Sequence, residues 1–243
     1  MKKIIIANWK MQLSFKDSLI LAKELKKKIK NPKNDTVICP GFLAIAPVVD
    51  ILRGGDLLLG AQNCALKNRG ALTGETSPET LNELGVKYVI VGHSERRLIL
   101  KEDSDLINAK IKAALAAKLI PIICVGETLN ERELGQTKKV LLAQVKGALK
   151  DVNIKNSSGI IIAYEPLWAI GTGEPIIPLE AEAIHIFLKA EVAKILGKKI
   201  RIVYGGSVNG GNAAQFLQEK NIDGLLIGSA SLNVQEFASI VKL

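Results

Sequence analysis

The sequence predicts an α/β fold, a (β/α)8 barrel in which eight parallel strands are ringed by helices. Eight short apolar runs recur at a mean spacing of about 31 residues, and a strand–helix–strand unit needs roughly 30. The runs are continuously apolar rather than alternating, as is typical of parallel strands that are buried on both faces. No linker or shift of composition divides the chain. We therefore expect residues 1–243 to form a single barrel domain.

The expected strands follow one another at similar intervals and begin near Lys3, Thr36, Leu57, Lys87, Ile120, Gly159, Ile200 and Asp223. The chain has no G-x-G-x-x-G motif after its first run and no G-x-x-x-x-G-K-S/T motif. Both motifs mark nucleotide-binding open sheets. Their absence favours the closed barrel over a doubly wound sheet.

The segments between these runs carry helix signals. Ser14 precedes apolar residues that recur every three or four positions, and Asp17 stands where a capping box has its acidic residue. The pair Ser77–Pro78 supplies an N-cap and a first helical residue for a short helix that ends at Gly85. Residues 105–118 are rich in Ala and Leu, which favour helix.

Composition and charge narrow the function classes. The chain is 48% hydrophobic and 23% charged, which is typical of globular proteins. The net charge is +9, and we expect the lysines to be dispersed over solvated helix faces, as with Lys23, Lys26 and Lys30. Aromatic residues make up only 4%, whereas nucleic-acid recognition relies on Arg forks and aromatic stacking. We therefore expect no nucleic-acid partner.

Cysteines and apolar runs indicate the compartment. Cys39, Cys64 and Cys124 lie far apart without a C-x-x-C pair, which is typical of a reducing cytosol. No apolar run approaches 18 residues, so we expect no membrane partner, and the first run is too short for a signal peptide. We expect a cytoplasmic protein. Its two histidines lie far apart and no carboxylates cluster at ligand spacing, so we expect no metal site.

Three reactive side chains follow expected strands. In a parallel barrel the carboxyl ends of the strands form one rim, where active sites lie. Lys10 follows the first strand, His93 the fourth and Glu165 the sixth. Glycine–serine turns follow the last two strands, at 205–207 and 228–229. Their backbone N–H groups suit a phosphate.

Glu165 is a candidate general base. It follows an apolar strand, so its carboxylate is expected to be partly desolvated, which suits that role. On position alone it could equally be a salt-bridged residue at a strand end. The apolar, glycine-containing loop at 166–173 favours the catalytic interpretation, because such a loop fits a lid that closes over a ligand and excludes water.

The two histidines and Lys10 receive different interpretations. His93 closes a buried strand and directly precedes a helix at Ser94. The helix dipole disfavours imidazolium there, so we expect a neutral ring that donates to a carbonyl; the alternative is a ring that only caps the backbone. His185 lies within a helix and is expected to be a packed or surface residue. Lys10 could stabilise developing negative charge, although most lysines are simply solvated.

These stretches resemble the triosephosphate isomerase family over the whole chain. The matching motifs are, in order, Asn8–Met11, Gly60–Asn63, Thr73–Glu75, Val91–Arg97, Ala163–Pro166 with Trp168–Gly173, Tyr204–Val208 and Gly228–Leu232. The resemblance implies an aldose–ketose isomerase that interconverts dihydroxyacetone phosphate and D-glyceraldehyde 3-phosphate through an enediolate, without a metal or other cofactor. This family is itself a standard example of lid closure.

The resemblance also implies a role for each rim residue. Glu165 would move the proton, neutral His93 would polarise the carbonyl, and Lys10 would stabilise the enediolate. Asn8 would lie beside Lys10, and Glu95 would orient this group from behind. The backbone N–H groups that would hold the phosphate belong to Gly171, Ser207, Gly228 and Ser229.

Members of the family are usually homodimers, and the resemblance implies the same here. The connection from Cys64 to Glu79 is long for a strand-to-helix loop, and it would insert near the active site of the partner. The residues that would reach that site are Thr73, Gly74 and Glu75.

A few positions depart from the family pattern. Ser229 stands where the family often has glycine; if that position needs positive φ, serine costs about 1 kcal/mol. Leu167 replaces the usual valine in the first lid hinge. Ala7 and Gln12 also differ from the usual glycine and asparagine. None of these changes removes a catalytic group.

Two alternative functions remain open. One is another phosphate-binding barrel enzyme, such as an aldolase or an epimerase. A Schiff-base aldolase would carry a lysine inside the sixth strand, where Ile160–Ile162 stand. The other is a non-catalytic basic binding protein on the same fold, which would be expected to have lost Glu165, His93 or the lid.

Overall fold

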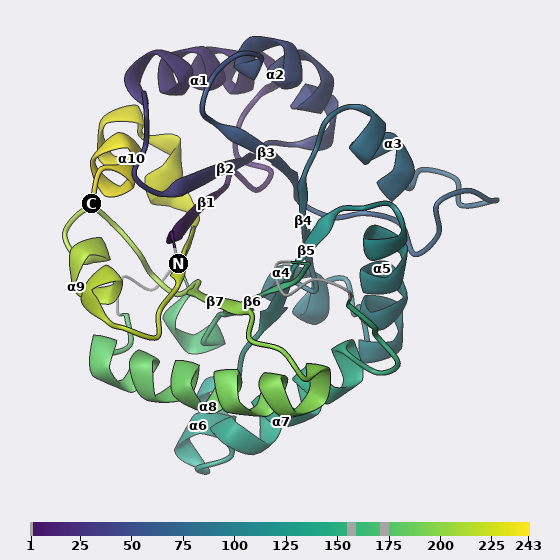
Figure 1. Cartoon of the computed structure of the whole chain (residues 1–243), viewed down its shortest axis with the longest axis vertical. Helices are drawn as coiled ribbons and strands as arrows, with labels where there is room; N and C mark the ends of the chain where they lie inside the picture. The colour runs from purple at the N-terminus through teal and green to yellow at the C-terminus, as the bar shows by residue number, and fades with distance from the viewer. Residues whose placement is uncertain (1, 155–158, 171–174) are drawn as a thin grey trace.

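The computed structural model describes residues 2–154, 159–170 and 175–243. Its eight strands form a closed parallel barrel, in which each strand pairs with the next and β8 pairs with β1. Helices surround this barrel (Figure 1), so the predicted (β/α)8 architecture is confirmed. The strands are β1 (Ile4–Asn8), β2 (Asp35–Cys39), β3 (Leu58–Ala61), β4 (Tyr88–Val91), β5 (Ile120–Val125), β6 (Ile161–Tyr164), β7 (Arg201–Tyr204) and β8 (Gly224–Ile227).

The helices alternate with the strands along the chain. The α-helices are α1 (Phe15–Lys28), α2 (Ile45–Leu52), α3 (Pro78–Glu83), α4 (Ser94–Leu98), α5 (Ser104–Ala116), α6 (Leu129–Glu133), α7 (Thr137–Ala148), α8 (Pro178–Leu196), α9 (Ala213–Gln218) and α10 (Val234–Val241). Short 3-10 turns lie at η1 (Phe42–Ala44), η2 (Leu167–Ala169) and η3 (Ser229–Leu232).

The helix starts follow the signals in the sequence. The Ser77 side chain accepts the Thr80 N–H and Pro78 begins α3, as expected. At α1 the Ser14 hydroxyl oxygen accepts the Asp17 N–H, but the Asp17 carboxylate accepts from the Ser14 hydroxyl, at 2.6 Å. The motif is thus half of the expected capping box, because aspartate is one methylene shorter than the glutamate that reaches back to the backbone.

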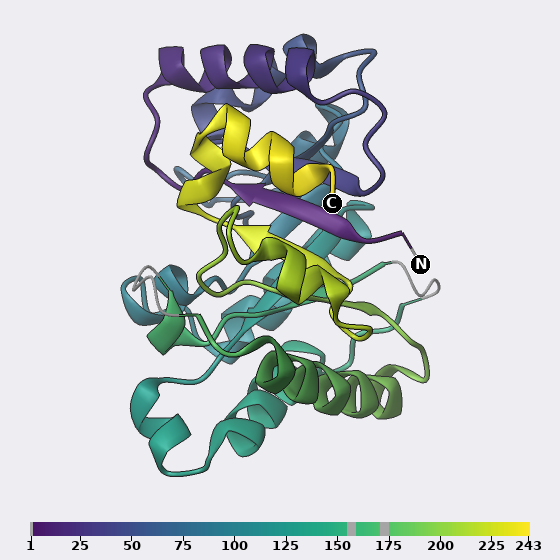
Figure 2. The same ribbon diagram turned by 90° about the vertical axis from the view of Figure 1, so that its left-hand side faces the viewer.

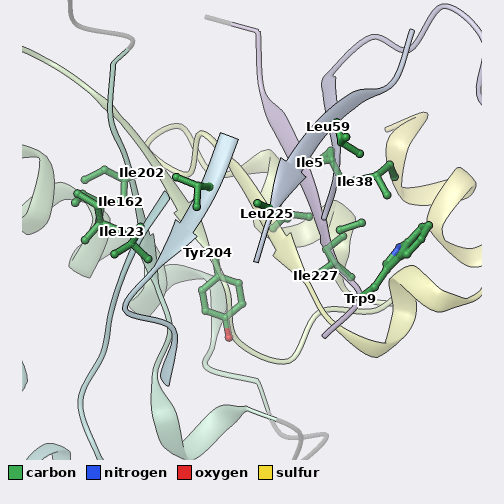
Figure 3. Close-up of a cluster of buried hydrophobic side chains, with 14 of the residues drawn as sticks. Ile5, Trp9, Ile38, Leu59, Ile123, Ile162, Ile202, Tyr204, Leu225 and Ile227 are labelled. Atoms are coloured by element: carbon green, nitrogen blue, oxygen red, sulfur yellow. The ribbon is translucent and has the colours of Figure 1, made fainter. Parts of the chain in front are cut away.

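Alternate side chains of each strand enter two separate apolar layers. On β1, Ile4 and Ile6 fill the barrel interior, whereas Ile5 packs in the layer between barrel and helices. Figure 3 shows that outer layer, with Ile5 and its counterparts Ile38 and Leu59 on neighbouring strands. Full burial of such a side chain stabilises the fold by about 1.5–3 kcal/mol. The strands read as continuous apolar runs because both of their faces are buried.

Closure of the barrel depends on one glycine. Gly224 of β8 lies opposite Ile4 of β1, and a Cβ on Gly224 would collide with the carbonyl oxygen of Ile4. Only glycine lets the last strand approach the first closely enough to pair.

The strands all point the same way, which fixes where a site can form. In Figure 2 the arrow of β1 points to the left, so the carboxyl ends of the strands lie on that side and the amino ends on the right. The predicted rim residues follow the carboxyl ends. Within the described ranges no helix is both long and apolar enough to cross a membrane.

His185 of α8 is a packed residue. It is fully buried, and its ring lies edge-on to Tyr164 with 6.1 Å between centroids. Burial lowers the pKa of His185 to about 3, although the nearby backbone of Asn221 and Ile202 offsets part of that effect. The folded protein therefore holds this ring neutral.

We expect His185 to make the fold acid-sensitive. Its folded pKa lies below its ordinary value of 6.5, so the unfolded chain takes up the proton first as the pH falls. The stabilising contribution of the neutral, buried His185 ring to the free energy of unfolding is present in full above pH 6.5. Below pH 6.5 this contribution declines by about 1.4 kcal/mol per pH unit. His185→Gln should flatten the profile of urea unfolding between pH 7.5 and 4.5 by that slope. Parallel profiles for the two proteins would contradict this prediction.

Candidate active site

One cleft at the carboxyl ends of the strands collects most of the predicted site residues. Seven of the predicted site residues line this cleft: Asn8, Lys10, His93, Glu165, Ser207, Gly228 and Ser229. Glu95 touches the group from outside the cleft, and the predicted dimer residues Thr73, Gly74 and Glu75 lie exposed in the β3–α3 connection. Gly171 and the far part of the expected lid lie outside the described residues.

Lys10 is held in an unusual backbone conformation. Its φ is +52°, a left-handed value that costs a non-glycine residue about 1 kcal/mol. Two side chains stabilise this turn: Asn8 Oδ1 accepts the Lys10 N–H at 3.1 Å, and Gln62 Nε2 donates to the Lys10 carbonyl at 2.7 Å. Gln62 also donates to the carbonyl of Cys39 at 3.0 Å, which ties the turn to β2. The turn after β1 thus aims the ammonium at the cleft.

Glu95 sits behind this ammonium. The Lys10 Nζ lies 2.7 Å from Glu95 Oε1, and the side chains are 21% and 47% exposed. At such exposure the pair adds little stability. Its consequence is positional, because it holds the end of a long flexible side chain between the cleft and α4.

His93 is the N-cap of α4, and this fixes its tautomer. The backbone N–H of Glu95 donates to His93 Nδ1 at 3.3 Å. The Glu95 carboxylate lies 3.5 Å from the same nitrogen, but it can only accept, and its other oxygen is already paired with Lys10. The helix fixes the backbone donor in place, so Nδ1 is an acceptor and Nε2 carries the hydrogen.

Glu165 faces that Nε2 atom across the cleft. Its Oε1 lies 3.4 Å from His93 Nε2, and its Oε2 accepts the Ser94 N–H at 3.3 Å. The residue is only 2% exposed, as expected from the apolar strand before it. Both of these contacts are long, and the carboxylate also lies against the Cys124 thiol. A buried carboxylate in this position suits the role of a general base.

The floor beneath Glu165 is buried and unreactive. Burial, and next to it the Glu165 carboxylate, raise the pKa of the Cys124 thiol well above its usual range. Arg97 donates to the carbonyls of Gly92 and Cys124 at 2.9 and 3.1 Å. The thiol therefore stays protonated, and it supports the site through packing.

The opposite wall of the cleft supplies backbone donors. The N–H groups of Ser207, Gly228 and Ser229 donate to no acceptor within the described part of the chain. The Gly228 carbonyl, in contrast, already accepts the N–H and the hydroxyl of Ser231, at 2.9 and 2.6 Å. Unpaired N–H groups beside an ammonium form an anion site.

The condition for strain at Ser229 is not met, because Ser229 is not among the described residues with positive φ. Gly228 before it has φ of −86°. Serine can therefore occupy this position without the left-handed penalty, and the possible cost of about 1 kcal/mol does not arise.

Glu127 is a residue that the sequence analysis missed. It lies just past β5 and is fully buried, and its Oε1 accepts from the Tyr164 hydroxyl at 3.1 Å and from Trp168 Nε1 at 3.0 Å. Burial raises the pKa of Glu127, and these two donors partly counter that shift. Its carbonyl also accepts the Leu167 N–H at 2.9 Å. Glu127 thus anchors the start of the expected lid to the strand that carries Glu165.

The sequence carries a weak signal for Glu127. It lies two residues past an apolar strand, a placement similar to that of Glu165, which directly follows β6. Its partners could not be found in this way, because Tyr164 and Trp168 reach it from a different strand and loop.

The fold and the cleft define a class, the phosphate-binding (β/α)8-barrel enzymes. A basic side chain, an imidazole whose Nδ1 accepts a backbone N–H, a buried carboxylate and free N–H groups meet at one rim. Within the described ranges, no group of three or more His, Cys, Asp or Glu side chains is placed to hold a metal ion. β6 carries isoleucine, alanine and tyrosine rather than the lysine that a Schiff-base aldolase needs.

Comparison with known proteins then identifies the family. A family model described as triosephosphate isomerase matches residues 3–243. A triosephosphate isomerase of Caldanaerobacter subterraneus subsp. tengcongensis is 43% identical, covering 99% of each chain, and one of Carboxydothermus hydrogenoformans is 45% identical, covering 99% of this chain and 98% of its own. The crystal structure of triosephosphate isomerase from Bartonella henselae superposes with a TM-score of 0.89 at 36% identity, covering 99% of this chain and 98% of that one.

The chain belongs to the triosephosphate isomerase family. It is therefore an isomerase, and its substrate is a triose phosphate. The non-catalytic alternative and the other barrel enzymes are not favoured.

Proposed function

We propose that Glu165, His93 and Lys10 together carry out the interconversion of dihydroxyacetone phosphate and D-glyceraldehyde 3-phosphate. The observation that carries this assignment is the 3.4 Å separation of Glu165 Oε1 and His93 Nε2 at the buried end of the cleft. A base and a hydrogen-bond donor so placed can act on adjacent atoms of one small substrate. Glu165 takes the proton from the carbon beside the carbonyl and returns it to the neighbouring carbon.

His93 acts as a neutral electrophile. Because Nδ1 accepts the Glu95 N–H, Nε2 presents its hydrogen to the substrate oxygens. This hydrogen bond stabilises the negative charge that develops on the carbonyl oxygen as Glu165 removes the proton. The ring can then move protons between the two oxygens of the enediolate.

Lys10 and the backbone donors hold the charged parts of the substrate. The ammonium stabilises the enediolate and attracts the phosphate, and Asn8 keeps its backbone turn in place. Glu95 is a positioning residue for Lys10. The phosphate is held by the N–H groups of Ser207, Gly228 and Ser229, which line the cleft.

No cofactor or metal enters this mechanism. A carboxylate, an imidazole and an ammonium can enolise a carbonyl compound by proton transfer and charge stabilisation alone. We expect residues 1–243 to act as one barrel domain in the cytoplasm.

The central test is Glu165→Asp. Shortening the side chain by one methylene moves the carboxylate back by about 1 Å, and such a misplacement can lower turnover around 100-fold. We expect kcat to fall by that factor in a coupled assay on D-glyceraldehyde 3-phosphate, with KM little changed. The matched control is Glu133→Asp at an exposed position, which should keep full activity. A folded Glu165→Asp protein with undiminished kcat would show that another group is the base.

The active form is a homodimer. An apolar groove runs beside the cleft and is lined by Met11, Phe42, Leu43 and Leu100 along with Lys10 and Glu95. Met11 is 97% exposed and Leu43 87% exposed, which is unfavourable for a monomer in water. An apolar surface that adjoins the catalytic lysine fits a partner whose binding completes the site.

The β3–α3 connection fits the groove of the partner. It projects from the barrel (Figure 1) and is braced internally, since the Ser77 hydroxyl donates to the Asn68 carbonyl at 2.6 Å and Arg69 pairs with Glu79 at 2.8 Å. A braced loop loses little entropy when it inserts. Its tip, Thr73, Gly74 and Glu75, is the part that reaches the partner's site.

Leu43→Lys should separate the dimer and lower activity together. Placing an ammonium in a buried apolar contact carries a large desolvation penalty, so we expect monomers by light scattering and turnover at least tenfold lower. Leu134→Lys, at a 61% exposed position on the far side of the barrel rim, is the control and should remain dimeric. A Leu43→Lys monomer with full turnover would refute the requirement for the partner.

A further inference from the structure

Many lysines lie on exposed helix faces as expected, for example Lys23 and Lys112, but others gather at one end of the barrel. Each helix of the barrel runs back against its strand, so the connections from helix to strand meet at the amino ends of the strands, opposite the cleft (Figure 2). Every one of these connections carries Lys or Arg. The cationic residues of this amino-terminal face are Lys30 and Lys33 before β2, Arg53 before β3, Lys87 before β4, Lys118 before β5, Lys150 before β6, Lys198 and Lys199 before β7, and Lys220 before β8, together with Lys2 and Lys242 near the termini.

Most of these ammonium groups are available to a partner. The exposed lysines that have no ion pair among the described residues are Lys30, Lys33, Lys87, Lys118, Lys150, Lys199, Lys220 and Lys242. The acids of the same face are fewer, and several are engaged. Asp35 pairs with Arg201 at 3.0 Å, Asp223 with Lys189 at 2.9 Å and Asp50 with Arg53 at 2.8 Å. Asp56 accepts the Asn31 N–H at 3.0 Å, and Glu182 accepts the Asn221 N–H at 3.1 Å. Further acids here are Glu83, Asp151 and Glu219.

The catalytic end of the barrel has the opposite character. There several cations are paired with acids, as in Lys10–Glu95, Arg69–Glu79 and Arg132–Glu180, at 2.7, 2.8 and 2.6 Å. The exposed lysines of this end that have no ion pair among the described residues are Lys16, Lys67, Lys101, Lys138 and Lys139. Further acids crowd the helix starts at this end, where they complement the helix dipole; they include Asp17, Asp103, Asp105 and Glu131. The excess of cations over acids therefore lies toward the amino-terminal face.

We propose that the amino-terminal face binds the surface of an anionic phospholipid bilayer. The attraction is electrostatic and peripheral, between lysine ammonium groups and lipid phosphates. It departs from the expectation that the protein has no membrane partner. That expectation rested on the lack of a spanning segment, which a peripheral electrostatic contact does not require.

The arrangement of the lysines favours a planar partner over a nucleic acid. Because the barrel is closed, its helix-to-strand connections form a ring, and a flat anionic surface can approach all of them at once. A rod such as duplex nucleic acid would reach only those beneath it. The exposed aromatic residues Phe15 and Phe42 both lie at the other end of the barrel, so the ring offers no platform for base stacking.

Binding by this face leaves the catalytic cleft directed away from the bilayer. The cleft lies at the carboxyl ends of the strands, and the ring lies at the amino ends. Vesicle-bound enzyme should thus turn over triose phosphate as the free enzyme does.

The test is co-sedimentation with vesicles of phosphatidylcholine alone or mixed equally with phosphatidylglycerol, at low and high salt. Two triple variants divide the ring: Lys33→Glu/Lys199→Glu/Lys220→Glu and Lys87→Glu/Lys118→Glu/Lys150→Glu. The matched control, Lys23→Glu/Lys138→Glu/Lys139→Glu, changes the net charge equally at exposed helix positions away from the ring. Isomerase activity of each variant reports that it is folded.

We expect the wild type to bind only the anionic vesicles, at low salt, and to be released by high salt. Each ring variant should bind roughly 100-fold more weakly, and the control should stay within threefold of the wild type. Failure of the wild type to bind, or equal weakening by the control, would overturn the proposal. The proposal would also be overturned if the wild type bound duplex DNA more tightly than the anionic vesicles and only one of the two ring variants weakened that binding. Such a result would identify a rod-shaped partner. All of these outcomes are independent of the isomerase assignment.

Discussion

The hydrogen bond from the Glu95 N–H to His93 Nδ1 sets the chemistry of the cleft. It exists because α4 begins at Ser94 and leaves its first N–H groups without partners inside the helix. One of those groups takes the imidazole nitrogen, and the next contact, from the Ser94 N–H, reaches Glu165. A single helix start therefore positions both the donor and the base.

The rest of the fold serves to bring other groups to that helix start. The parallel closure of the barrel puts Lys10 on the same rim, and Gln62 and Asn8 hold its left-handed turn. This strain, about 1 kcal/mol, is small beside the burial of the two apolar layers. Glu127 fixes the start of the expected lid in a similar way, because its carboxylate accepts hydrogen bonds from both Tyr164 and Trp168.

The features that could be predicted from the sequence are those with local signals. Strand runs, the caps of α1 and α3, and the rim positions of Lys10, His93 and Glu165 depend on residues that are close in the chain. The partners of Glu127 and Gln62 come from other strands, so no local pattern reveals them. The basic ring was missed for the same reason, because only closure of the barrel gathers Lys33, Lys118 and Lys220 at one end.

The most direct measurement is the nitrogen NMR spectrum of His93 in protein labelled with ¹⁵N at histidine. His185 provides an internal reference, and His93→Gln assigns the signals. Because Nδ1 accepts the Glu95 N–H, we expect the hydrogen of His93 to be on Nε2, with none on Nδ1, in the free enzyme. A doubly protonated ring, or a hydrogen on Nδ1, would contradict this expectation, because the Glu95 N–H could not then be the donor and Nε2 could not act as described.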